Sequence, residues 1–173
     1  MITSSRILLI LLLLTSIMGC KSSRQVAESV VHTETLPEVE ATHQDSTFAI
    51  YQRTPCFGMC PYFNLTIYES GYAVYEGKNF VDLIGFYHAR FDKSSLQKIK
   101  ETAESIQYFS LDEKYDNPNV TDLPTTTTGI MIEGVLKTVA ARYKAPKALE
   151  SVYQVLDELI EDAKWTQKTD FKY

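Results

Sequence analysis

The chain has 173 residues, of which 45% are hydrophobic and 12% aromatic, and its formal net charge at pH 7 is −5. Its length suits one folded domain, because single domains commonly have about 100–200 residues. The acidic balance disfavours nucleic acid and anionic lipid head groups as partners, because both attract basic surfaces.

Residues 1–19 have the features of a lipoprotein signal peptide. Arg6 gives a short positive segment, residues 7–14 are an unbroken apolar run, and Gly19 stands directly before Cys20. This lipobox pattern predicts that the cysteine is diacylated and becomes the new N-terminus. A plain transmembrane anchor is disfavoured, because a spanning helix needs about 20 apolar residues. Removing this segment takes one positive charge away, so the net charge becomes −6.

The rest of the chain divides into three parts by composition. Residues 20–46 comprise the lipidated cysteine and a polar segment without helical or strand periodicity, which predicts a flexible tether. Residues 47–166 are predicted to form the folded domain, and residues 167–173 a C-terminal tail. We expect a protein anchored by its lipid in the cell envelope. The outer membrane is the favoured location, because Lys21 stands where an aspartate would signal retention in the inner membrane.

Alternating hydrophobicity predicts strands over residues 48–53, 62–69, 72–77 and 83–91, and a later hairpin over 125–133 and 135–143. Helical spacing of apolar residues follows a possible cap at Asp92 or Ser94. It recurs after Pro146, which is expected in the first turn of the last helix. The order is therefore about ββββ-α-ββ-α. It predicts a single α+β domain with a mainly antiparallel sheet and two helices packed on one face.

Cys56 and Cys60 lie in a turn between the first two predicted strands. Behind a signal peptide the compartment is oxidising, which favours a disulfide between nearby cysteines. Pro55, Gly58 and Pro61 exclude a continuous helix, and a bent turn brings two Cα atoms within bridging distance. The turn also offers Arg53, Phe57 and Met59 as candidate surface contacts.

Two other interpretations of the cysteine pair remain open. One is a redox-active pair, although reactive pairs usually lie at a helix N-terminus and here a strand follows. The other is copper, because Cys-x-x-x-Cys-Pro with a distant His resembles the copper-site motif of Sco-type assembly factors. His88, with Met59, would complete a soft Cu(I) site with the two cysteines.

Sequence signatures of common enzymes are absent. The chain has no Gly-x-Ser-x-Gly, no His-Glu-x-x-His and no phosphate-binding glycine-rich loop. Catalysis by carboxylates alone leaves no such signature, so an enzyme is disfavoured rather than excluded. We expect no catalytic residues, no resident metal and no cofactor apart from the covalent lipid. The acidic loop over residues 112–122 lacks EF-hand spacing and is interpreted as solvated.

The cysteine motif also carries a resemblance. Residues 53–62, followed by residues 65–68, Gly71 and the sequence Tyr75-Glu76-Gly77, are similar to the start of an uncharacterised bacterial family, domain of unknown function 6438. The resemblance covers about residues 46–166. It implies a small secreted or lipid-anchored domain and supplies no activity and no catalytic residues.

The sequence therefore predicts a lipid-anchored envelope protein that acts as a non-enzymatic binding or envelope-assembly module. Its expected partners are the membrane, through the lipid, and an envelope protein or glycan. The alternative is a thiol-redox or copper-binding envelope protein that uses the cysteine motif.

The lipid anchor can be tested at its attachment point. Cys20→Ala removes the only expected acylation site, so the protein should leave the membrane fraction and lose labelling by a fatty-acid analogue. Membrane fractionation and lipid labelling measure both effects. An unchanged membrane fraction would contradict the anchor.

Overall fold

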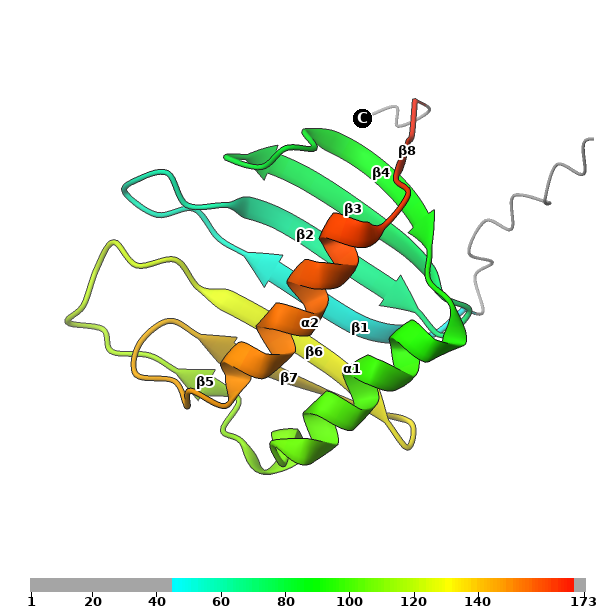
Figure 1. Cartoon of the computed structure of the whole chain (residues 1–173). Coiled ribbons are helices and arrows are strands. Elements are labelled where there is room, and N and C mark those ends of the chain that lie inside the picture. The colour runs from blue at the N-terminus through cyan, green and yellow to red at the C-terminus, as the bar shows by residue number, and fades with distance from the viewer. Residues whose placement is uncertain (1–44, 170–173) are drawn as a thin grey trace, which may run out of the picture. The chain divides into compact units, whose positions relative to one another are not determined.

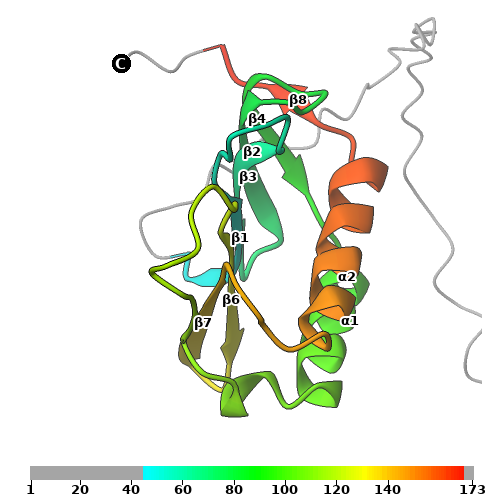
Figure 2. The same ribbon diagram turned by 90° about the vertical axis from the view of Figure 1, so that its left-hand side faces the viewer.

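The computed structural model describes residues 45–169 (Figures 1 and 2). The predicted signal peptide, Cys20 and nearly all of the tether lie outside these residues. Within the described range, no helix is long and apolar enough to cross a membrane.

In this part of the chain, eight strands form one sheet, in the order β5-β7-β6-β1-β2-β3-β4-β8. All neighbours are antiparallel except β5 and β7, which are parallel. Both α-helices lie on one face of the sheet (Figure 2). The elements are β1 (Thr47–Arg53), β2 (Tyr62–Tyr68), β3 (Tyr72–Asn79), β4 (Gly85–Arg90), α1 (Lys93–Ser105), the 3₁₀ turn η1 (Tyr108–Ser110), β5 (Lys114–Tyr115), β6 (Thr126–Ile132), β7 (Val135–Ala141), α2 (Leu149–Asp162) and β8 (Thr166–Gln167).

The predicted α+β class is confirmed, as is the antiparallel character of the sheet. The sequence did not indicate β5 or β8, because two residues are too few to show a strand period. β8 pairs with β4, and the Lys168 amide donates to the Phe86 carbonyl at 2.9 Å. The segment expected as a tail therefore begins inside the sheet.

The two helices differ in how their N-termini are capped. Asp92 caps α1, where its carboxylate accepts a hydrogen bond from the Ser95 amide at 2.8 Å. This is the usual way to satisfy an amide in the first turn of a helix. The last helix, α2, begins at Leu149, so Pro146 lies just before it rather than in its first turn. The Pro146 carbonyl instead closes a turn by accepting from the Leu149 amide at 3.1 Å.

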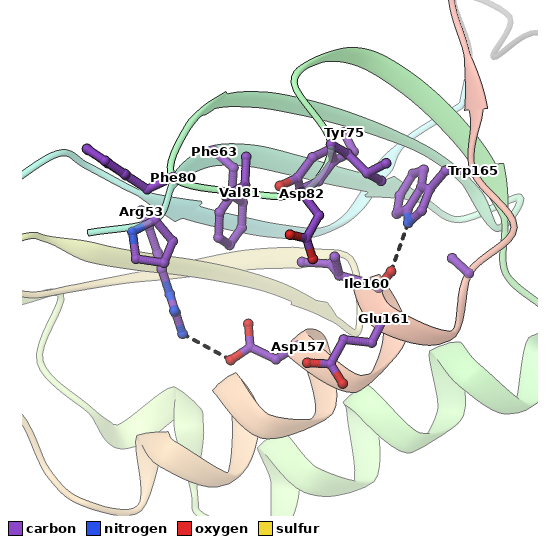
Figure 3. Close-up of a pocket in the computed structure, with 13 residues that line it drawn as sticks. Arg53, Phe63, Tyr75, Phe80, Val81, Asp82, Asp157, Ile160, Glu161 and Trp165 are labelled. Atoms are coloured by element: carbon purple, nitrogen blue, oxygen red, sulfur yellow. Dashed lines mark hydrogen bonds and ion pairs between the residues drawn. The ribbon is translucent and has the colours of Figure 1, made fainter. Parts of the chain in front are cut away.

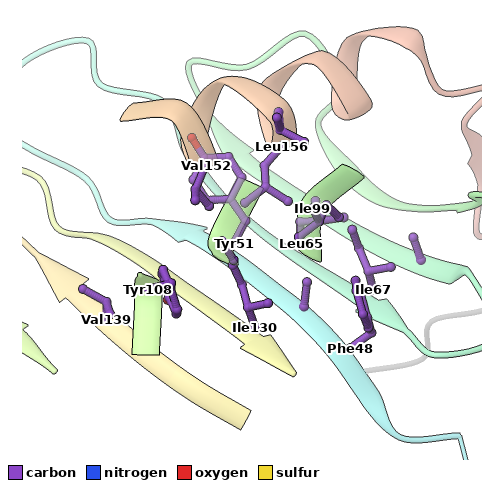
Figure 4. Close-up of a cluster of buried hydrophobic side chains, with 14 of the residues drawn as sticks. Phe48, Tyr51, Leu65, Ile67, Ile99, Tyr108, Ile130, Val139, Val152 and Leu156 are labelled. Atoms are coloured by element: carbon purple, nitrogen blue, oxygen red, sulfur yellow. The ribbon is translucent and has the colours of Figure 1, made fainter. Parts of the chain in front are cut away.

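Apolar side chains from the sheet and both helices form one core (Figure 4). Tyr51 and Leu65, from neighbouring strands, are completely buried. Ile99 of α1 and Leu156 of α2 are at most 1% exposed. Burying one such aliphatic side chain contributes about 1.5–3 kcal/mol, so packing of the helices on this face supplies the main stabilisation.

The loop between β3 and β4, residues 80–84, folds back over Gly77. A Cβ added at Gly77 would lie 1.6 Å from the carbonyl oxygen of Leu83. No side chain fits in that space, so glycine is what allows the loop to approach the strand. Phe80 starts the reversal with a φ of +52°, and its amide donates to its neighbour Asn79 Oδ1 at 3.0 Å.

Gly77→Ala tests this close approach. The added methyl should displace the loop and destabilise the domain by about 1–3 kcal/mol, the range for overpacked sites. Gly58→Ala is the matched control, because its nearest neighbour would be 3.8 Å away. Its effect should stay within about 0.5 kcal/mol. Chemical unfolding under non-reducing conditions measures both, and equal losses would contradict the interpretation.

Candidate functional site

A pocket of about 680 Å³ lies between the β3–β4 loop, the end of the sheet and the C-terminal half of α2 (Figure 3). We call it the α2 pocket. Its volume falls in the range of small-molecule and side-chain sites. It is lined by Arg53, Pro61, Phe63, Tyr75, Phe80, Val81, Asp82, Leu83, Asp157, Ile160, Glu161, Ala163 and Trp165.

One end of the pocket is closed by a polar link between β1 and α2. The Tyr51 hydroxyl donates to Asp157 Oδ1 at 2.9 Å, and Arg53 Nη2 donates to Asp157 Oδ2 at 3.0 Å. Arg53 Nη2 also donates to the Tyr51 hydroxyl oxygen. Burial raises the pKa of Tyr51 well above its usual value. The hydroxyl therefore keeps its proton at neutral pH and stays a donor to the carboxylate.

The Arg53 guanidinium is also held by aromatic rings. Its central carbon lies 5.2 Å from the ring centre of Tyr51 and 5.8 Å from that of Phe63, within the range of cation–π attraction. Its side chain is 26% exposed. Arg53 is therefore fixed in the wall of the pocket by two rings and a carboxylate.

The opposite end of the pocket is aromatic. The Trp165 indole N–H donates to the Ile160 carbonyl at 2.9 Å, which fixes the ring at the end of α2. Its centre lies 5.4 Å from that of Tyr75. Burial raises the pKa of Tyr75 to about 12, with smaller contributions from the negative charges of Asp82 and Asp157. Carboxylates from the loop and from α2 thus act on the same hydroxyl.

The loop between β1 and β2 borders this pocket through Pro61. We call residues 54–61 the disulfide loop, because the sulfurs of Cys56 and Cys60 lie 1.91 Å apart with Cα atoms separated by 5.7 Å. The two sulfurs are bonded to each other, and the Cα separation is the usual one for a disulfide. Phe57 and Met59, inside the ring that the bond closes, are 93% and 84% exposed.

The structure separates the three candidate surface contacts predicted from the sequence into two kinds. Phe57 and Met59 project from the disulfide loop, whereas Arg53 is a partly buried wall residue in an ion pair. His88 is not brought to the cysteines. It lies in the middle of β4, with its ring 6.0 Å from Tyr72. No group of three His, Cys, Asp or Glu residues suited to a metal occurs among residues 45–169.

The acidic loop is tied to the sheet by ion pairs. Asp116 accepts from Arg142 Nε at 2.6 Å and lies 3.2 Å from the Lys114 ammonium. The interpretation of this loop as simply solvated was therefore incomplete, since one of its carboxylates serves to join β5 to the end of β7.

The sequence did not indicate Asp82, Asp157, Glu161 or Trp165 as site residues. They are far from Arg53 along the chain, and Asp157 is separated from it by 104 positions. A weak signal exists on α2, where positions 157 and 161 form an i, i+4 acidic pair beside the apolar stripe. It indicates one acidic row on the helix but not what the row faces.

The different roles of Arg53 and Phe57 give a stability test. Arg53→Met keeps the length of the stem but removes the ion pair and both cation–π contacts. It should destabilise the domain by about 1–2 kcal/mol, a value reduced by partial exposure. Phe57→Ala removes an exposed ring and should change stability by less than about 0.5 kcal/mol. Chemical unfolding measures both; a larger loss for Phe57→Ala would mean that the ring is packed.

Comparison with known proteins identifies one relationship. No curated protein and no solved structure matches the chain. The family model described as "Domain of unknown function (DUF6438)" matches residues 47–160, which span β1 to nearly the end of α2. The match includes the disulfide loop and most of the residues that line the α2 pocket. Because it covers more than half of the sequence, the chain belongs to the DUF6438 family.

Proposed function

We propose that this protein is a non-enzymatic binding module of the cell envelope. In this proposal a lipid on Cys20 anchors the chain, most simply in the outer membrane, and the folded domain binds a partner protein through the disulfide loop. The observation that carries the proposal is the pair of almost fully exposed apolar side chains, Phe57 and Met59, held in a cross-linked loop.

Exposure of these two side chains is unusual for their chemistry. Folding normally buries Phe and Met, because removing their apolar surface from water is favourable. A partner surface that covers them gains this free energy, and aromatic residues are frequent binding hot spots. The disulfide limits the conformations of the loop, so less entropy is lost when a partner binds.

The neighbouring β3–β4 loop brings two more exposed apolar side chains to the same end of the sheet. Phe80 and Ile84 of the β3–β4 loop are 49% and 53% exposed. Pairing of Tyr62 with Asn79 places the start of β2 beside the end of β3, so the disulfide loop and the β3–β4 loop leave the sheet at the same end. Several exposed apolar side chains at one end of the fold are consistent with an interaction site there.

A protein is favoured over the other partners considered. A glycan offers little apolar area to cover Phe57 and Met59. An anionic membrane surface would be repelled by the nearby carboxylates Asp82 and Glu161. A thiol-redox or copper function has less support, since the two sulfurs are at bonding distance and His88 is remote from them.

Site-specific photo-crosslinking tests the proposed function in the full chain. A photoreactive phenylalanine analogue replaces Phe57 in cells with an intact envelope. We expect one discrete, light-dependent adduct, because a hot-spot ring lies within bonding reach of its partner. Met59→Ser in the same chain should reduce the yield of that adduct.

The matched control carries the analogue at Phe109. This ring is 39% exposed and lies in η1, away from both loops. It should give no comparable adduct. Absence of an adduct from position 57, or identical products from both positions, would contradict binding through the disulfide loop.

A further inference from the structure

We propose that the α2 pocket binds a positively charged group on an apolar stem, namely a Lys or Arg side chain of the partner protein. This inference rests on the proposed binding function and adds the chemistry of what the pocket recognises. It is carried by the lining of the pocket, which already holds one such group, Arg53, at one end.

Arg53 shows how this pocket accommodates a cation. Its guanidinium lies against the rings of Tyr51 and Phe63 and pairs with Asp157 at 3.0 Å. Aromatic faces attract the cation through their quadrupoles, and the carboxylate accepts charge-assisted hydrogen bonds.

The other end of the pocket has the same types of group without a cation. Tyr75 and Trp165 supply the rings, and Asp82 and Glu161 supply the carboxylates. Asp82 points from the β3–β4 loop toward α2, which carries Glu161 (Figure 3). Within residues 45–169, no basic side chain forms an ion pair with either of these two carboxylates.

The charge of the lining selects among ligands. The lining contains three carboxylates and one guanidinium, so its net charge is −2. An anion would be repelled. A neutral apolar group would displace water from Asp82 and Glu161 without replacing their hydrogen bonds, which is unfavourable. A Lys or Arg side chain satisfies both parts of the lining, because its stem packs on the rings and its head meets the carboxylates.

The pocket contains its own reporter, because Trp165 is the only tryptophan of the chain. The full chain is purified in detergent and titrated with N-acetyl-lysine amide, and the indole N–H signal of Trp165 is followed by NMR. We expect a saturable shift. N-acetyl-norleucine amide, which has a similar stem without the charge, should bind roughly tenfold more weakly or worse.

Two double variants test the carboxylates. Asp82→Asn with Glu161→Gln removes both pocket charges and should abolish the saturable shift. Glu69→Gln with Glu133→Gln removes two charges from turns at the opposite end of the sheet and should leave the titration unchanged. All four substituted side chains are exposed, so both variants should keep the fold. The midpoint of chemical unfolding of each variant checks this.

Three results would overturn the inference: no shift with the lysine probe, an equal response to the norleucine probe, or an equal loss in the control variant. The outcome is separable from the proposed function. A chain with Met59→Ser should bind the lysine probe normally, because Met59 does not line the pocket, while its crosslinking yield from position 57 falls. A saturable shift without any adduct from position 57 would leave the pocket inference standing and contradict only the loop contact.

Discussion

The contact on which the site most depends is the link between Tyr51, Arg53 and Asp157. Tyr51 is completely buried on β1, which lies in the interior of the sheet between β6 and β2. Its hydroxyl and the guanidinium of Arg53 both donate to one carboxylate of α2. A buried hydroxyl needs a partner, and a partly buried carboxylate needs donors, so each group satisfies the other. The same link sets the distance between sheet and helix at one end of the α2 pocket.

The remaining walls of the pocket are fixed by separate local constraints. Gly77 allows the β3–β4 loop to fold onto the sheet, and the indole hydrogen bond of Trp165 to Ile160 fixes the segment after α2. The disulfide shapes the loop that borders the pocket. The first two constraints meet at Tyr75, whose ring packs near Trp165 and would lie 3.0 Å from a Cβ at Gly77, so a change at one of these walls should affect the other. Phe57 and Met59 are exposed and do not line the pocket, so the loop contact and the pocket can be studied separately.

The sequence predicts the fold well, because its signal is local. Alternation over residues 62–69 identifies β2 directly, and the apolar stripe after Pro146 identifies α2 to within a few residues. The site is different, because it is assembled from distant segments. Arg53 looks like an exposed strand end in the sequence, and only the approach of Asp157 across 104 positions shows that it is partly buried. Nothing local to Gly77 indicates that a loop will fold over it. The exposure of Phe57 and Met59 was predictable, since prolines and cysteines around them mark a turn.

The ion pair between Arg53 and Asp157 also determines which groups of the pocket are available to a ligand. Asp157 already accepts hydrogen bonds from Tyr51 and Arg53, so an incoming cation does not need to compete for it. Asp82 and Glu161 remain available, and the rings of Tyr75 and Trp165 beside them are already in place. Binding to such a site requires little rearrangement of the protein, which lowers the entropy lost on association. The link that holds α2 on the sheet therefore also leaves Asp82 and Glu161 in position for a partner's cation.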